Sequence, residues 1–237
     1  MKKIDEMALD GQRDNVLGPS FSYRARRARG NGRDSFYQRF GKRLFDLTFA
    51  VLTLPLVLPT LVVLYFFVRR DGGPFFYSQP RVGRDGEMFN CVKVRSMVVN
   101  AEDLLEGMFE CDEALRREWD EHYKLDGDPR ITKTGQLLRK TSIDELPQIF
   151  NVLRGEMSVV GPRPITPMEL ERYGDAAKDY VAVRPGITGL WQITGRREAD
   201  FENRAILDTK YASKVSFWRD LYIVLATVPE VILARGR

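Results

Sequence analysis

The sequence predicts a mainly helical α+β protein that is monotopic, with a re-entrant helix hairpin in the membrane and a small cytosolic domain that contains a short β-hairpin. The first observation is an apolar segment, residues 44–68, which two prolines interrupt and basic residues flank on both sides. The second is Asp85-Gly86, a turn signal followed by alternating apolar and polar residues. A chain of 237 residues has room for one such domain and a membrane segment.

Residues 1–38 are predicted to form a flexible, basic N-terminal tail. They are polar, contain glycine and lack the apolar periodicity of a helix or strand. No apolar core segment precedes residue 44, so no cleaved secretory signal is expected. Arginines gather at the end of the tail and lead directly into the apolar segment. Anionic lipids of the inner leaflet are therefore the expected partner, and no nucleic acid partner is expected.

Residues 39–70 are predicted to form the re-entrant membrane hairpin. A straight helix over the apolar part would be about 37 Å long, enough to cross a bilayer, so a single span remains an alternative. Pro55 and Pro59 lie in its middle, and each removes a backbone hydrogen bond and kinks a helix. Basic residues at both ends place both ends on the cytoplasmic side. Asp46 is expected to cap the first turn of the helix.

Residues 71–237 are predicted to form the cytosolic domain. A hairpin is expected between Gly73 and Met97, a helix from Asn100, and another over residues 168–183. Near the end, residues 211–233 mix aromatic and aliphatic side chains. This pattern fits a helix in the membrane interface, although ordinary core packing fits equally well.

The central stretch carries the candidate chemistry. Ser142 and Glu145 have the spacing of a capping box, and Asp144 and Glu145 form an adjacent carboxylate pair that alone is more often a helix cap than a catalyst. Arg163 lies between two prolines, which hold its guanidinium in a rigid turn suited to phosphate. With Arg139 on the other side, these residues fit a site that neutralises a diphosphate beside a nucleophilic or metal-binding acid.

Two later turns carry further candidate binding residues, and the low numbers of histidine and cysteine exclude other kinds of site. Arg184 and Arg196 lie in turns rich in glycine, which suit either a phosphate or nucleotide cradle or ordinary structural turns. The single histidine excludes a histidine-rich metal site. The two cysteines exclude a disulfide framework.

Six motifs in order, over about residues 40–235, resemble those of the bacterial monotopic polyprenyl-phosphate sugar-1-phosphate transferases, which begin exopolysaccharide assembly. Several separate motifs in the same order are far more specific than any one of them. The motifs are Lys42-Arg43-Leu44-Phe45-Asp46, Arg81-Val82-Gly83-Arg84-Asp85-Gly86, Lys93-Val94-Arg95-Ser96-Met97, Ser142-Ile143-Asp144-Glu145-Leu146-Pro147-Gln148, Val160-Gly161-Pro162-Arg163-Pro164 and Val183-Arg184-Pro185-Gly186-Ile187-Thr188-Gly189-Leu190-Trp191-Gln192.

The resemblance implies transfer of a hexose-1-phosphate from a UDP-sugar to undecaprenyl phosphate, with release of UMP, at the cytoplasmic face of the bacterial inner membrane. It implies that Asp144 is the nucleophile of a covalent phosphosugar intermediate and Glu145 its partner, with Mg²⁺ bound by both. It also implies the same re-entrant hairpin. Substrate phosphate or nucleotide would be held by Arg139, Arg163, Pro164, Arg184 and Arg196.

Several alternatives stay open at this point. Direct transfer in a ternary complex, with Asp144 only holding metal, would need no covalent intermediate. A non-enzymatic membrane-anchored module that binds anionic lipid or nucleic acid through its basic flank is the rival from another class. The short N-terminus without a multi-span domain resembles compact family members, which favours UDP-galactose or UDP-glucose as donor. The oligomeric state is open, a homodimer included.

Overall fold

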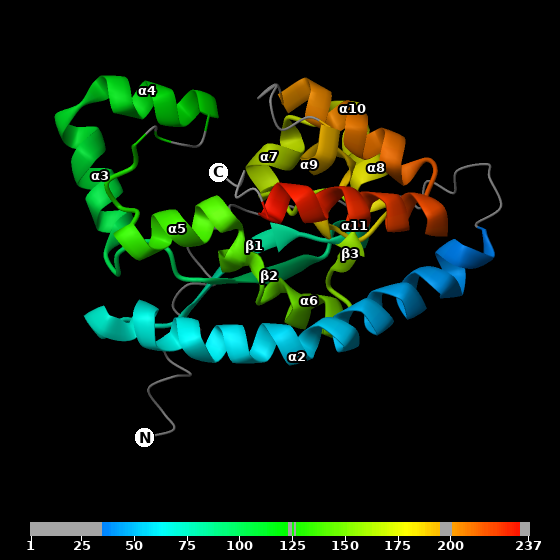
Figure 1. The fold of residues 1–237 in the computed structure, drawn as a ribbon. Coiled ribbons are helices and arrows are strands. Elements are labelled where there is room, and N and C mark those ends of the chain that lie inside the picture. Colours follow the sequence, from blue (N-terminus) through cyan, green and yellow to red (C-terminus); the bar gives the residue numbers. More distant parts are fainter. Residues whose placement is uncertain (1–34, 123–124, 126, 195–200, 233–237) are drawn as a thin grey trace.

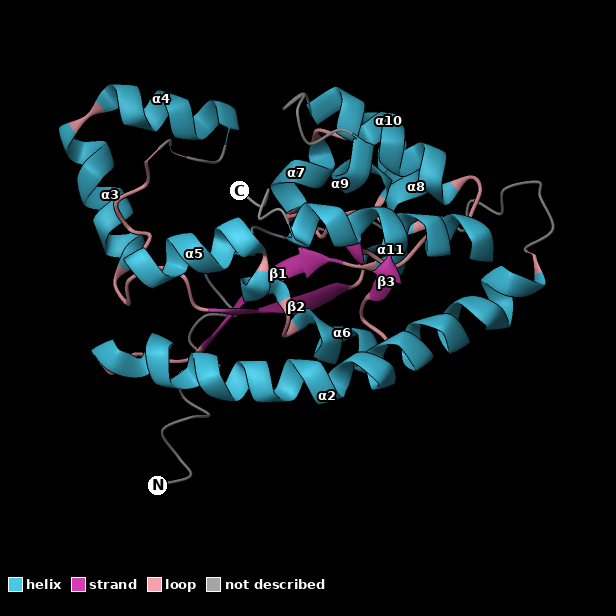
Figure 2. Cartoon of the chain, in the orientation of Figure 1, coloured by secondary structure: helices cyan, strands magenta, loops and turns pink. Residues whose placement is uncertain are grey.

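The computed structural model describes residues 35–122, 125, 127–194 and 201–232. The fold is mostly helical, with two small two-stranded sheets (Figure 2). In Figure 1 the strands lie between the long helix α2 on one side and a group of helices on the other. Residues 1–34 of the predicted tail and the predicted site residue Arg196 lie outside the described residues.

Helix α2, Lys42–Val68, is one continuous helix of 27 residues, preceded by a π-helical turn at Tyr37–Gly41. It continues through Pro55 and Pro59 and is curved in Figure 1, so the predicted pair of helices joined by a bend is not confirmed. Both prolines lie on the exposed side, while one stripe of the helix packs against the body on either side of them. The stripe consists of Asp46, Ala50, Val57, Leu61 and Val68.

The run Tyr37–Asp71 is long and apolar enough to cross a membrane by length and composition. Both the re-entrant path and the single span therefore stay predictions. Apart from the packed stripe, the helix exposes large apolar side chains that the body leaves uncovered. Among them are Leu44, Leu52, Leu56, Val62 and Phe66.

The predicted β-hairpin is present. Strands β1, Phe76–Val82, and β2, Met88–Val94, pair antiparallel, with Phe76 opposite Val94. Asp85 and Gly86 in the turn have φ of 58° and 80°, the left-handed conformation that an Asp-Gly pair tolerates well.

Helix α6, Gln148–Arg154, lies along the free edge of β2. The side chain of Asn151 makes the edge contacts that a third strand would make. Its amide nitrogen donates to the carbonyl of Asn90 at 2.8 Å, and its oxygen accepts from the backbone N–H of Val92 at 3.1 Å. One buried side chain thus fixes α6 relative to the hairpin.

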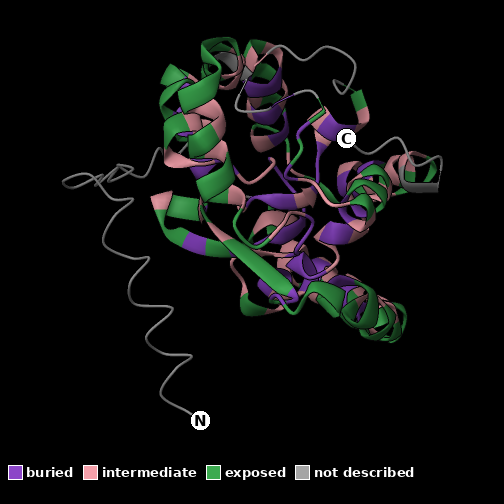
Figure 3. Ribbon diagram, turned by 90° about the vertical axis from the view of Figure 1, so that its left-hand side faces the viewer, coloured by how far each residue is buried: buried purple, intermediate pink, exposed green. Residues whose placement is uncertain are grey.

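A second sheet, which the sequence did not predict, pairs β3, Ser158–Val160, in parallel with β4, Gly186–Thr188. Each strand has only three residues, too few to show an alternating pattern. All three residues of β3 are buried. Figure 3 shows the buried residues gathered at the centre of the molecule, around the strands.

The remaining helices cover this centre or project from it. The predicted helix at 168–183 is instead two short helices separated by a 3₁₀ turn at Gly174–Ala176, and the predicted helix at 211–233 begins only at Phe217. Helices α3 and α4 form an arm that projects from the body in Figure 1. The helices are α3 (Ala101–Cys111), α4 (Glu113–His122), α5 (Lys133–Thr141), α7 (Pro167–Glu171), α8 (Ala177–Val181), α9 (Leu190–Thr194), α10 (Phe201–Ala212) and α11 (Phe217–Ile232).

A buried charge cluster joins α2 to the body. The Lys42 ammonium lies 2.7 Å from Asp220 of α11 and 3.5 Å from Asp46, and it also donates to the carbonyl of Val160 at 2.9 Å. Asp46 is fully buried and accepts from the Ser158 hydroxyl at 2.9 Å, so the prediction that it caps the first turn is wrong. Its partners on β3 come from distant sequence, which a local helix-capping rule does not consider.

We expect Lys42→Met to lower the free energy of unfolding by about 3–5 kcal/mol, because two buried carboxylates would lose their cation. Lys178→Met, at an exposed position on α8, is the matched control and should change stability by less than about 0.5 kcal/mol. Chemical unfolding in neutral detergent micelles, followed by tryptophan fluorescence, measures both. Equal stability of the two variants would contradict this account of the cluster.

Candidate active site

The carboxylate pair lies on a 3₁₀ turn, Ile143–Glu145, between α5 and α6. Ser142 has φ 57°, and its N–H bonds to the carbonyls of Leu138 and Arg139, which ends α5. Its hydroxyl caps nothing, so the predicted capping box at Ser142 is wrong. Adjacent residues point about 120° apart in a 3₁₀ turn and about 100° apart in an α-helix, so the turn by itself does not direct both carboxylates to one side.

Glu145 is held by two cations from separate elements. Its Oε1 lies 2.7 Å from Nζ of Lys93 on β2 and 3.4 Å from Nη2 of Arg163 in the turn after β3. The negative charge of Glu145 is the main cause that raises the pKa of Arg163. Glu145 therefore orients two cationic groups at the side of Asp144.

Asp144 is buried, with 6% of its surface exposed. Burial is the largest influence and raises the pKa of its carboxyl group, and the neighbouring Glu145 raises that pKa further. Lys93, Arg139 and Arg163 act in the opposite direction and lower the pKa. The cations thus favour the ionised form of a carboxylate that burial would otherwise protonate.

Arg139 approaches from the last turn of α5. Its Nε donates to the hydroxyl of Ser96 at 2.8 Å, which fixes the guanidinium beside the hairpin. Burial lowers the pKa of Arg139, and the charge of Asp144 partly offsets that effect. The structure therefore brings together four of the residues singled out in the sequence: Asp144, Glu145, Arg139 and Arg163.

The turn that carries Arg163 is held by the second sheet. Gly161 has no room for a side chain, because a Cβ there would clash with the carbonyl oxygen of Arg184. The N–H of Gly186 donates to the carbonyl of Pro162 at 2.7 Å. Pro164 lies half-buried in the same turn, and its predicted substrate contact stays a prediction.

Two contributions to the site were missed in the sequence. Lys93 was not among the predicted site residues, although its place two residues after the buried Cys91 puts it on the same face of β2. Glu169 was not considered. It bonds Arg81 at 3.1 Å and also completes a capping box with Thr166 at the start of α7. Thr166 and Glu169 show the box spacing that was assigned only to Ser142 and Glu145.

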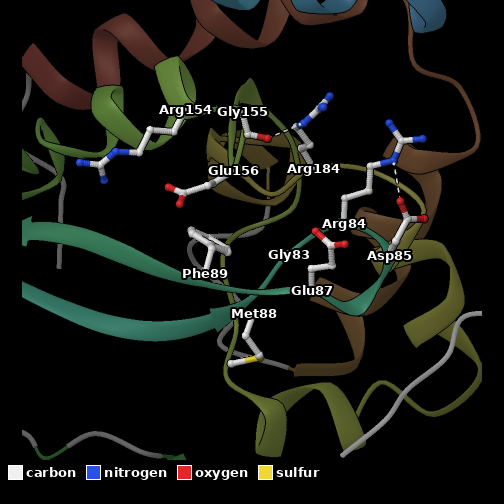
Figure 4. Close-up of a pocket in the computed structure, with 10 residues that line it drawn as sticks. All are labelled: Gly83, Arg84, Asp85, Glu87, Met88, Phe89, Arg154, Gly155, Glu156 and Arg184. Atoms are coloured by element: carbon white, nitrogen blue, oxygen red, sulfur yellow. Dashed lines mark hydrogen bonds and ion pairs between the residues drawn. The ribbon is translucent and has the colours of Figure 1, made fainter. Parts of the chain in front are cut away.

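Arg184 lies elsewhere. It lines a pocket of about 400 Å³, shown in Figure 4, at the C-terminal end of α6. Glu145 instead precedes the N-terminal end of that helix. The helix between them rises by about 10 Å. The structure therefore separates Arg184 from the carboxylate pair, and its contact with substrate stays a prediction.

The carboxylate pair suits Mg²⁺ as a donor set. Mg²⁺ typically takes one or two protein carboxylates and completes its shell with water and substrate phosphates. Within the described part of the chain, no three or more His, Cys, Asp or Glu side chains are grouped as a metal cage. Asp144 and Glu145 together therefore fit a metal shared with a diphosphate rather than one held by protein alone.

Residues 37–234 match the bacterial sugar transferase family. The chain is 50% identical over 198 residues to a UDP-galactose-lipid carrier transferase of Erwinia amylovora, covering 84% of this chain and 42% of the relative. It is 46% identical to an undecaprenyl-phosphate galactose phosphotransferase of Salmonella typhimurium, with the same coverage. It is 45% identical to the exopolysaccharide production protein ExoY of Sinorhizobium fredii, covering 82% of this chain and 87% of the relative. The chain thus spans less than half of the first two relatives.

The left-handed conformation of Ser142 gives a test of the turn that carries the carboxylates. We expect Ser142→Ala to be nearly neutral, because the hydroxyl caps nothing, and Ser142→Val to cost at least about 1 kcal/mol, because a β-branched residue is strained there. Ser142→Gly should be neutral or stabilising by up to about 1 kcal/mol. Thermal unfolding midpoints give the ranking, and a valine variant as stable as the alanine variant would contradict it.

Proposed function

The chain belongs to the bacterial sugar transferase family, and we propose that it transfers a hexose-1-phosphate from a UDP-sugar to undecaprenyl phosphate, the first step of an exopolysaccharide pathway. The observation that carries the proposal is a buried acid, Asp144, next to Glu145 and surrounded by Lys93, Arg139 and Arg163. Such an arrangement can hold the two phosphates of a nucleotide sugar against a carboxylate.

The proposed reaction has two displacements at one phosphorus. A carboxylate oxygen of Asp144 attacks the phosphorus that bears the sugar, the bond from that phosphorus to the UMP oxygen breaks, and UMP leaves with the electron pair. An oxygen of undecaprenyl phosphate then attacks the same phosphorus and releases the Asp144 carboxylate. Direct transfer without the aspartyl intermediate is the competing path.

The surrounding cations have distinct parts in this proposal. Arg163 and Lys93 are both held by Glu145, so their positive charge is fixed before substrate arrives. Arg139 is fixed through Ser96 and lies on the side of α5. Together they would bind diphosphate oxygens and reduce the repulsion between an anionic nucleophile and an anionic substrate.

Mg²⁺ is the proposed cofactor, held by Asp144 and Glu145. When bound, it would neutralise charge on the diphosphate and on the departing phosphate. The protein's own part is to carry both carboxylates next to each other on one 3₁₀ turn.

We propose that the protein works at the cytoplasmic face of the inner membrane, with α2 re-entrant and anionic lipids around its basic ends. The exposed apolar surface of α2 supports membrane contact, since soluble surfaces rarely leave such large apolar areas uncovered. Helix α11 also exposes Trp218 and Tyr222 while it buries Ile223, which fits a helix packed on the body with one face toward the interface.

The names of two relatives refer to galactose, which supports UDP-galactose as donor alongside UDP-glucose. One hydroxyl orientation separates these sugars, and a few side chains can set it. A homodimer is compatible with the proposal, although the carboxylate pair and its surrounding cations all come from one chain. Incubation with each UDP-sugar, Mg²⁺ and undecaprenyl phosphate, with UMP measured, tests the donor and the reaction together.

Asp144→Asn should lower UMP release by a factor on the order of 10³ or more, because an amide cannot act as the nucleophile. Membrane association should be unchanged. Asp175→Asn, at an exposed position, is the matched control and should retain parental turnover. Parental turnover by Asp144→Asn would refute the nucleophile, and absence of UMP from the parental protein with every UDP-sugar would favour the non-enzymatic module. Trapping of labelled phosphosugar on the parental protein without acceptor separates the covalent path from direct transfer.

Lys93→Gln should move the acid limb of the pH–rate profile to higher pH. The nucleophile must be ionised, so activity falls as the pH drops through the pKa of Asp144, and Lys93 is the first of the groups that lower this pKa. Loss of that cation raises the pKa further. The control Lys210→Gln, exposed on α10, should leave the limb in place. A limb that is unmoved or shifted to lower pH in Lys93→Gln would contradict this electrostatic account.

A further inference from the structure

A second polar pocket lies apart from the carboxylate pair, at the C-terminal end of α6. Its volume is about 400 Å³, and Figure 4 shows the side chains around it. Arg184 comes from the loop before β4, Arg84 from the turn of the hairpin, and Arg154 from the last residue of α6. Three acids, Asp85, Glu87 and Glu156, also line it.

Arg184 and Arg43, beside this pocket, form hydrogen bonds that stabilise the fold, but these bonds do not use every N–H group of Arg184. Arg184 donates from Nε to the carbonyl of Gly155 at 2.7 Å, and Arg43 donates from its two Nη atoms to the carbonyls of Val152 and Leu153 at 2.6 and 3.0 Å. These bonds add side-chain donors to the carbonyl groups at the end of α6. They leave the two Nη groups of Arg184 without a hydrogen-bond partner within the described part of the chain.

Three acids line the pocket, and they compensate this charge weakly, because Asp85 and Glu87 are exposed to solvent. Asp85 lies 3.5 Å from Arg84, but both side chains are at least half exposed, so solvent screens the pair. Glu156 is engaged by the Asn151 amide at 2.6 Å. Burial and then repulsion from Arg84 and Arg43 lower the pKa of Arg184, which indicates that its surroundings are short of negative charge.

The pocket and the carboxylate pair lie too far apart for one phosphate group to touch both. Along α6 the separation is about 10 Å. Along β2, Phe89 lines the pocket and Lys93 bonds Glu145, and four residues of an antiparallel strand rise by about 13 Å. Two independent elements therefore give similar spacings.

We propose that this pocket is a second anion site that binds a phosphate group through Arg184 and Arg84. In Figure 4 these two side chains extend to the same side of the pocket, whereas Arg154 extends to the other. The bond from Nε of Arg184 to Gly155 fixes the guanidinium, so its two Nη groups form a preorganised fork for phosphate oxygens. A soluble nucleotide or a phospholipid headgroup carries this chemistry, and Arg43 at the start of α2 brings the pocket close to the apolar helix.

The test uses the full chain with Asp144→Asn in neutral detergent micelles, so that no turnover takes place and the outcome does not depend on the transferase reaction. Calorimetric titrations with inorganic phosphate, UMP and dihexanoyl phosphatidylglycerol give a Kd for each probe. Arg184→Gln retains a donor for Gly155 but loses the fork, and Arg84→Gln changes an exposed turn residue that the fold does not need. Arg117→Gln on the projecting helix α4 is the charge-matched control.

We expect at least one probe to lose tenfold or more in affinity with Arg184→Gln, to lose affinity with Arg84→Gln, and to be unaffected by Arg117→Gln. Loss confined to UMP identifies a nucleotide, and loss confined to the phosphatidylglycerol identifies a lipid headgroup. Absence of binding by every probe, or equal losses with Arg184→Gln and Arg117→Gln, would overturn the proposal. So would a loss that appears only with Arg163→Gln, since the probe would then occupy the carboxylate site.

Discussion

The Lys42 ammonium, shared between Asp220 and Asp46, is the interaction on which the placement of the site depends. Burying charge is costly, and the cluster lowers that cost because one cation meets two carboxylates and the carbonyl of Val160. Val160 ends β3 and directly precedes the turn that carries Arg163. The same contact therefore fixes the apolar helix to the body and positions the strand that leads into the turn with Arg163.

Helix α6 positions polar residues at both of its ends. Asn151 fixes it along β2, so the 3₁₀ turn before it brings Glu145 to Lys93, and the residues after it meet Arg43 and Arg184. Seven residues of helix thus set the distance between the carboxylate pair and the second pocket. Helix α6 can keep the carboxylate pair and the second pocket at a fixed separation because its backbone is rigid and Asn151 fixes its position along β2.

Features formed by residues close in the sequence could be predicted, whereas contacts between residues far apart in the sequence could not. The Asp85-Gly86 turn and the Asp144-Glu145 pair depend on neighbouring residues and are visible in the sequence. The burial of Asp46, the pairing of β3 with β4 and the contact between Lys93 and Glu145 join residues far apart, and strands of three residues leave no pattern. Helix α2 runs without a break through Pro55 and Pro59, and packing along one stripe supports it on both sides of the prolines; its re-entrant path in the membrane stays a prediction.

Positive charges outnumber negative charges around the carboxylate pair, and this imbalance affects the stability of the site. Lys93, Arg139 and Arg163 face Asp144 and Glu145, which leaves an excess of one positive charge in a partly buried site. A structural ion-pair network would minimise such an excess, since unpaired charge in a low-dielectric region is destabilising. The excess is favourable only when an anion completes the site. In the proposed reaction a diphosphate would complete the site, and the fixed positions of Arg139 and Arg163 would keep the cost of reorganisation on binding small.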